Sequence, residues 1–285
     1  MRFVDYRRPA EVELVEAPVL ESVERYPGCW LLRLELPSLA PRIGAGQFLH
    51  VKPSGALAPY LRRPFSVYDV PEAPAGAVDL LYAVVGGGTA ALAALRPGDR
   101  ASVLGPLGRT FDYAADGAWH LLVAGGIGVA PFPDLAKRLI AAGAEPARDV
   151  QAVLGARTAR ALFCRDDYER LGVPFAVATD DGSAGFHGNA VALAGQCLDA
   201  ARARDPGRPV RVYGCGPEPM LRALQALCVA RGVPGQLSID RRMACGLGIC
   251  RSCVVAVADA PGRDAWHFET VCREGPIFDT ATLRW

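Results

Sequence analysis

Four cysteines near the C-terminus constrain this chain more than any other feature. Cys245, Cys250 and Cys253 follow a C-x4-C-x2-C spacing, and Cys272 comes after eighteen intervening residues. This is the spacing of plant-type [2Fe–2S] proteins, in which four thiolates share two irons. The pattern predicts a [2Fe–2S] cluster held by these four residues, and a protein that moves single electrons.

Structural zinc is the main alternative to a cluster. Zinc ribbons usually carry two closely spaced cysteine pairs, whereas this chain has one C-x2-C pair and an isolated Cys272. A disulfide framework is disfavoured because nine cysteines is an odd number and no secretion signal precedes them. Gly246 and Gly248 suit a tight loop that aims amide groups at sulfur. The cluster is therefore the favoured interpretation.

Length and charge narrow the class of protein. A chain of 285 residues is long enough for two or three domains. Its net charge is +1, and no run of like charges indicates a nucleic-acid partner. The N-terminal segment lacks a basic-then-apolar signal pattern, and no apolar stretch is long enough to span a membrane. These features and the cluster motif together predict a protein of the reducing cytoplasm.

The first part of the chain, residues 1–112, has the alternation of β-strands. One short helical run at 89–99 interrupts six strand candidates, which are separated by proline and glycine turns. The candidates are 11–23, 29–36, 46–53, 62–70, 77–85 and 100–108. Short strands in this number predict a small closed antiparallel barrel.

The pattern of apolar residues changes in residues 113–232. Apolar strand candidates alternate there with helical segments, which predicts a parallel sheet covered on both faces. The strand candidates are 120–125, 149–157, 174–181 and 208–215. From residue 233 to 285 the helical pattern stops, and a small cysteine-rich module is expected. The fold class is thus β plus α/β in three domains.

Two glycine turns end strands of the predicted parallel sheet. The first runs from Gly125 to Pro131 and departs from G-x-G-x-x-G because Pro131 takes the last glycine position. The second runs from Tyr213 to Glu218. Ligands bind at the carboxyl ends of parallel strands, so the two turns together predict a dinucleotide site. Ordinary βα turns, with Cys215 as a small buried residue, are the alternative.

Two further segments could bind phosphate. Arg62 and Arg63 are adjacent on a predicted strand and point to opposite faces, so one can clamp a phosphate while the other stays solvated. Ser66 needs a bend at Pro64 to share a ligand with Arg63. The glycines before Thr89 open a short helix and offer amide groups to an anion; a turn capped by Thr89 is the alternative.

Other polar residues receive structural interpretations. The acids in the turn 179–183 either hold ribose hydroxyls or cap the turn, and the turn is the safer interpretation. Trp285 is expected simply to end the chain rather than to stack on a flavin. The histidines lack ligand spacing and are expected to be structural; they are His50, His120, His187 and His267.

These segments together resemble the electron transfer subunits of NAD-dependent dihydroorotate dehydrogenases. The resemblance rests on LRRPFSV and VVGGGT, on LLVAGGIGVAP and YGCGPEPML, and on SIDRRMACGLGICRSCVV with VCREGPIF. It covers nearly the whole chain. Its most specific parts are RMACGxGxC, the TDDGS turn and the C-x-x-GP-x-F ending. The first two domains alone indicate only the wider ferredoxin–NADP reductase superfamily.

The resemblance implies FAD between the barrel and the α/β domain, with NAD(H) beside it and a [2Fe–2S] cluster on the four cysteines. The residues matching flavin positions are Arg63, Pro64, Phe65, Ser66, Leu81, Tyr82, Ala83, Gly88 and Thr89. Those matching nicotinamide positions are Gly126, Gly128, Cys215 and Gly216. Two positions depart from the family: Gly87 replaces a common basic residue, and Asp240 replaces the usual Glu.

The resemblance also implies a partner subunit. In this family an FMN-containing subunit oxidises dihydroorotate, and electrons pass through the cluster and FAD to NAD+. Nicotinamide accepts a hydride, a cluster carries single electrons, and FAD can do both. The expectation is an electron transfer subunit of pyrimidine biosynthesis in a heterotetramer, without its own catalytic residues for dihydroorotate.

Two other functions stay open at this point. A diaphorase subunit of a hydrogenase or of a ferredoxin:NAD(P)H oxidoreductase has the same three domains, although some such relatives replace Cys245 by aspartate. A non-enzymatic iron–sulfur sensor is disfavoured by the intact nucleotide motifs. The choice between NAD and NADP is open too, because Arg157 rather than an acid follows the second strand.

Overall fold

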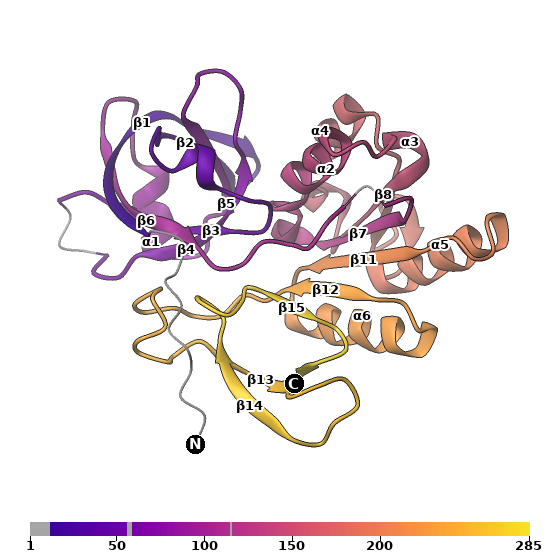
Figure 1. Ribbon diagram of the computed structural model, residues 1–285. Coiled ribbons are helices and arrows are strands. Elements are labelled where there is room, and N and C mark those ends of the chain that lie inside the picture. Colours follow the sequence, from indigo (N-terminus) through magenta and orange to yellow (C-terminus); the bar gives the residue numbers. More distant parts are fainter. Residues whose placement is uncertain (1–11, 56–58, 115) are drawn as a thin grey trace.

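A computed structural model describes residues 12–55, 59–114 and 116–285. Figure 1 shows a barrel beside an α/β sheet, with the C-terminal module below both. The N-terminal segment examined for a signal pattern, and Glu11 of the first strand candidate, lie outside the described residues. No helix in the described part of the chain is long and apolar enough to cross a membrane.

The barrel is closed and antiparallel, as predicted, with the strand order β1-β2-β5-β4-β3-β6. Alternate side chains fill its interior because successive residues of a strand point to opposite faces. The strands are β1 (Glu13–Tyr26), β2 (Cys29–Glu35), β3 (Phe48–Pro53), β4 (Arg63–Asp69), β5 (Ala77–Ala83) and β6 (Arg100–Leu107). The helix α1 (Gly87–Ala93) lies between β5 and β6, and a 3-10 turn, η1 (Ala40–Arg42), precedes β3.

The two faces of β3 serve different parts of the molecule. Leu49 and Val51 belong to the core inside the barrel. Phe48 points outward and joins a second core with Leu104 and Leu107 of β6. His50 is two residues from Phe48 and therefore shares its outward face. This outer face carries the contact between the barrel and the C-terminal module.

The second domain is built on a sheet of seven strands in the order β10-β9-β8-β7-β11-β12-β15. All its pairings are parallel except that of β12 with β15. The strands are β7 (Trp119–Gly125), β8 (Val150–Ala156), β9 (Phe175–Thr179), β10 (Phe186–His187), β11 (Val210–Cys215), β12 (Gly235–Ser238) and β15 (Ile277–Asp279). The predicted parallel sheet is confirmed.

Helices cover both faces of this sheet (Figure 1). Apolar residues of α2 and α4 form one core with the sheet, and those of α5 and α6 form another. The helices are α2 (Phe132–Ala141), α3 (Pro146–Asp149), α4 (Arg165–Leu171), α5 (Ala190–Arg204) and α6 (Glu218–Arg231), with 3-10 turns η2 (Gly126–Val129) and η3 (Ala159–Ala161). Two separate cores follow from strands that are apolar on both sides.

The C-terminal module contains a small sheet in the order β14-β13-β16. Its strands are β13 (Val254–Ala258), β14 (Trp266–Thr270) and β16 (Leu283–Arg284). Two strands beyond residue 233, β12 and β15, extend the sheet of the second domain instead. The module is thus tied to that domain by backbone hydrogen bonds. The bounds 1–112, 113–232 and 233–285 stay a prediction.

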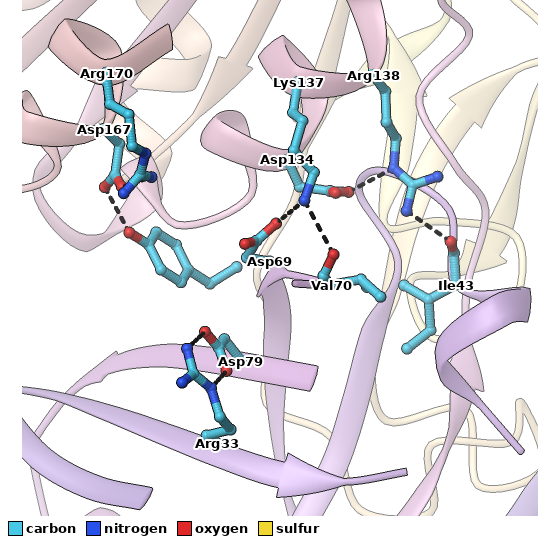
Figure 2. A network of polar contacts seen from close by, with 11 residues as sticks. Arg33, Ile43, Asp69, Val70, Asp79, Asp134, Lys137, Arg138, Asp167 and Arg170 are labelled. Carbon is cyan, nitrogen blue, oxygen red and sulfur yellow. Dashed lines mark hydrogen bonds and ion pairs between the residues drawn. The ribbon is translucent and has the colours of Figure 1, made fainter. Parts of the chain in front are cut away.

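Polar side chains join the barrel to the helices of the α/β domain (Figure 2). The Tyr68 hydroxyl of β4 donates to the fully buried carboxylate of Asp167 at 2.5 Å, and Arg170 donates to the same carboxylate at 2.6 Å. Lys137 of α2 pairs with Asp69 and donates to the Val70 carbonyl. These contacts fix the barrel against α2 and α4.

Candidate functional site

A cavity of about 910 Å³ lies where the barrel, the α/β sheet and the C-terminal module meet. Its walls come from segments far apart in the chain. The predicted cofactor residues that line it are Arg63, Pro64, Phe65, Ser66, Leu81, Tyr82, Ala83, Thr89, Gly126, Gly128, Cys215 and Gly216. Gly88 is the predicted residue that does not line it. The volume suits a nucleotide-sized ligand.

The barrel wall of the cavity is formed largely by β4 and β5. Phe48 of β3 is directly opposite Ser66 of β4 and extends the same wall. Phe65 also belongs to the interior core of the barrel, where its ring lies 5.0 Å from that of Tyr82. The wall is apolar with a few polar groups, which is the usual lining of a cofactor site.

Arg63 lies against Gly88 of α1. A Cβ atom on Gly88 would come within 2.6 Å of the guanidinium carbon of Arg63. The glycine thus leaves room for the Arg63 guanidinium at this end of β4. The Thr89 hydroxyl accepts hydrogen bonds from the amides of Val85 and Gly86, at 2.9 and 3.1 Å. Thr89 therefore shapes the turn, which was the alternative interpretation.

The expectation that Arg62 stays solvated is wrong. Its side chain is partly buried, lines the cavity, and donates to the Ser102 hydroxyl at 2.8 Å. Arg62 precedes the first residue of β4, so strand alternation does not apply to it. Both arginines therefore bring positive charge to the cavity, from different directions.

The α/β wall consists of the two glycine turns, which lie side by side. A Cβ atom on Gly128 would come within 2.5 Å of the Cys215 carbonyl oxygen and 2.6 Å of the Gly216 Cα. Only glycine permits this approach of one backbone to the other. Burial raises the pKa of the Cys215 thiol to about 12. Cys215 is thus a neutral contact group rather than a nucleophile.

The turn after β9 closes on itself. The Asp181 carboxylate accepts from the Ser183 amide at 3.0 Å and from its hydroxyl at 2.6 Å. The Ser183 hydrogen bonds lower the pKa of Asp181. This is the capped turn that the sequence favoured.

The C-terminal module supplies a third wall that the sequence did not predict. Met243 and Asp240, which stand before the cluster loop, line the cavity, and so does Trp285. The guanidinium of Arg222 lies 5.0 Å from the centre of the Trp285 ring, and the indole N–H donates to Gln225. The interpretation of Trp285 as a bare chain end is therefore wrong. The aromatic side chain of Trp285 was the sequence signal that could have indicated a place in the cavity wall.

The four predicted cluster ligands form two thiol pairs. Cys250 interacts with Cys245, and Cys253 interacts with Cys272. In the part of the chain that the structure describes, no three candidate ligands gather around one point as they do at a single metal ion. The thiol contact lowers the pKa of Cys253 to about 6, and the Ser252 hydrogen bond does the same for Cys250.

Amide groups of the loop point at these sulfurs. The amides of Leu247 and Gly248 approach the sulfurs of Cys245 and Cys272 at 3.3 and 3.1 Å. Gly246 and Gly248 have φ angles of 72° and 77°, which glycine adopts without strain. A two-iron cluster takes four thiolates, two for each iron. Two thiol pairs with amide donors around them fit such a cluster.

Comparison with known proteins identifies the chain. A family model described as "Iron-sulfur cluster binding domain of dihydroorotate dehydrogenase B" matches residues 240–284, and one described as "Oxidoreductase NAD-binding domain" matches residues 122–226. The "Dihydroorotate dehydrogenase B (NAD(+)), electron transfer subunit" of Desulforamulus reducens is 34% identical over 96% of this chain and 99% of its own length. The protein of the same name from Bacillus caldolyticus is 42% identical over 82% of this chain and 84% of its own length.

Solved structures agree with this relationship. A structure described as "Insights into flavin-based electron bifurcation via the NADH-dependent reduced ferredoxin-NADP oxidoreductase structure" matches 95% of this chain and 90% of its own, with a TM-score of 0.78 and 26% identity. A "Ferredoxin reductase in carbazole 1,9a-dioxygenase" matches 79% of this chain and 68% of its own at 23% identity, with a TM-score of 0.63, and shows the fold alone. The chain belongs to the family of dihydroorotate dehydrogenase B electron transfer subunits.

Proposed function

We propose that this chain is the electron transfer subunit of an NAD-dependent dihydroorotate dehydrogenase in pyrimidine biosynthesis, with FAD, a [2Fe–2S] cluster and NAD(H) as cofactors. Electrons from an FMN-containing catalytic subunit enter at the cluster and leave as a hydride on NAD+. The observation that carries the proposal is the single cavity whose three walls come from the barrel, the glycine turns and the cluster module.

Bound FAD would supply the one chemistry that the chain's own residues lack, since it exchanges both single electrons and a hydride. The chain's residues position it. Arg63 would offer a guanidinium to a phosphate, and Pro64 and Ser66, which line the cavity, would contact the flavin. Gly128 and Gly216 bring backbone amides close to a second nucleotide.

We assign the cluster to Cys245, Cys250, Cys253 and Cys272. Cys253 and Cys272 are buried in the core that the module shares with the barrel and the sheet. Cys250 is exposed. The ligand set would therefore reach from the protein interior to the surface, as a centre that receives electrons from another protein requires.

The surface around the exposed ligand suits a partner. Leu247 is 41% exposed and Ile249 is 78% exposed. Four apolar residues flank the cluster ligands in the sequence: Ile249, Val254, Ile277 and Phe278. Ile277 and Phe278 are instead buried in the cores, and Val254 is partly buried. We propose that the loop around Ile249 contacts the catalytic subunit in a cytoplasmic heterotetramer.

The test is reconstitution. The purified chain alone should pass electrons from NADH to an artificial dye but form no orotate. Adding the FMN-containing subunit should produce NADH from dihydroorotate and NAD+, followed by absorbance. A cofactor-replete mixture that forms no NADH would refute the pairing. It would favour a ferredoxin or hydrogenase partner, which the structural similarity to a ferredoxin-NADP oxidoreductase makes the second candidate.

A further inference from the structure

His50 is a buried polar residue that neither the fold nor the proposed function explains. Its side chain is 1% exposed, and neither ring nitrogen has a hydrogen-bond partner. A buried polar group without a partner destabilises the folded protein, and native proteins rarely keep one without a ligand or a water. From the sequence alone this histidine was expected to be structural.

The His50 ring carries at least one N–H donor whether it is neutral or protonated. Burial lowers the pKa of His50 to about 4, and the charge of Arg62 adds to that effect. The backbone carbonyl of Arg62 opposes the shift without forming a hydrogen bond to the ring. A neutral imidazole has one N–H donor and one acceptor nitrogen. His50 therefore has a donor to offer to a group that binds beside it.

The ring lies against the cluster loop. A Cβ atom on Gly246 would come within 2.8 Å of His50 Nδ1 and 3.3 Å of a Leu107 methyl group. Gly246 directly follows Cys245, and its φ of 72° belongs to the tight turn around the cluster position. The backbone of the loop thus rests on the outer face of β3 and β6, with His50 in contact.

The outer face of β3, which His50 shares with Phe48, adjoins a core that contains sulfur atoms. The core between the barrel and the module contains apolar residues such as Phe48, Leu104 and Met243, and also the sulfur atoms of Cys253 and Cys272. The bound cluster would lie between these cysteines and Cys245. Its sulfurs, and those of its ligands, carry partial negative charge and accept hydrogen bonds that tune the reduction potential.

We propose that His50 is a positioning residue for the [2Fe–2S] cluster, whose ring N–H donates a hydrogen bond to a sulfur of the cluster or of its Cys245 ligand. This inference rests on the proposed function. The bond strengthens when the cluster gains an electron, because the sulfurs then carry more negative charge. The contact therefore raises the reduction potential of the cluster.

The same strand face connects this contact to the flavin cavity. Phe48 lines the cavity, and His50 is the next residue on the same side of β3. Side chains two residues apart on a strand are separated by about 7 Å. A change at His50 thus acts on the cluster side of the wall and leaves the flavin side of β3 intact.

The test is pulsed EPR of the holoprotein with 15N-labelled histidine, after reduction with dithionite. We expect a weak 15N coupling to the reduced cluster, and its loss in His50→Leu. The control is His120→Gln, because His120 is also buried but pairs with Tyr213 in the sheet of the second domain. This variant should keep the coupling.

The same variants give a second readout. His50→Leu should make reduction of the cluster about tenfold less favourable, which is a shift of about 59 mV to lower potential for one electron. His50→Gln, which keeps an N–H donor, should recover part of the shift. Redox titration followed by EPR measures both variants against the wild type.

The outcomes separate the two proposals. A normal cluster signal without histidine coupling in the wild type would overturn the role of His50 and indicate a packed ring or one bound to water. An unchanged potential in His50→Leu would do the same. If His50→Leu fails to assemble a cluster, the presence or absence of the 15N coupling in the labelled wild-type protein still tests the role of His50. Absence of any [2Fe–2S] signal in the wild type would instead refute the proposed cluster.

Discussion

Replacing Gly88 by alanine should weaken FAD binding through Arg63. The new Cβ atom would collide with Nε of Arg63 and would lie 2.6 Å from the guanidinium carbon and 2.8 Å from Nη2. The guanidinium must retreat by roughly 1 Å, which is enough to break a hydrogen bond of normal length. A charge-assisted hydrogen bond contributes about 1.5–3 kcal/mol. The dissociation constant of FAD should therefore rise about ten- to a hundredfold.

Arg63→Ala should cause a loss of the same size, and the double variant should be no weaker than Arg63→Ala alone. The reason is that Gly88 acts only by making room for this arginine. The matched control is Gly87→Ala, because nothing lies within 4 Å of a Cβ atom there. It should bind FAD normally and stabilise α1 by about 0.5–1 kcal/mol.

Flavin fluorescence on dilution measures the dissociation constants. If the losses of the two single variants multiply in the double variant, Gly88 contributes independently of Arg63 and the reasoning is wrong. A normal affinity in Gly88→Ala would refute it as well. The comparison with Gly87→Ala removes any general effect of alanine in the helix.

Four further outcomes follow from the structure. Cys245→Ser should lose the cluster signal in EPR while NADH still bleaches the flavin. Gly128→Ala should raise KM for NADH at least tenfold with FAD content unchanged, because its Cβ meets the Cys215 backbone; an unchanged KM in dye assays would contradict this. Asp167→Ala should lower the free energy of unfolding by about 1–3 kcal/mol, measured with urea, because it leaves the buried Tyr68 hydroxyl without an acceptor. Hydrogen bonds from Arg148 and Arg208 lower the pKa of the Asp149 carboxyl. The free energy of unfolding that this ionised carboxyl contributes is present above about pH 4 and should be lost as the pH falls below it. Asp149→Asn should therefore flatten the dependence of the melting temperature on pH in this range.

The sequence predicted the elements whose signals are local. Strand alternation predicted the barrel, and strand–helix alternation predicted the parallel sheet. Cysteine spacing indicated a four-thiolate cluster, and its ligand set stays a prediction. The glycine turns were also found, because strand ends at one edge of a sheet must lie together. Each of these inferences needs only neighbours in the chain and general rules of topology.

The failures concern contacts between distant segments. By their place in the sequence, β12 and β15 were expected to lie in the cysteine-rich module. They pair instead with the sheet of the second domain, because a strand can join the open edge of a sheet in either direction. Arg62 was placed by strand alternation although it precedes the strand. His50 has the sequence context of a lone structural histidine, and its place beside Gly246, from the other end of the chain, is visible only in the folded protein.

Packing between the barrel, the α/β sheet and the C-terminal module fixes the middle of the electron path, between the flavin wall and the cluster loop. The core that contains Phe48 of the barrel also contains Cys253 and Cys272 of the module, so folding itself sets the distance between flavin wall and cluster loop. The buried carboxylate of Asp167 holds the barrel against α4 in the same way. Neither contact can slide without exposing apolar surface or an unpaired charge. We therefore expect motion during turnover at the two ends of the path, which are the glycine turns of the proposed nicotinamide site and the loop around Ile249 that we propose contacts a partner.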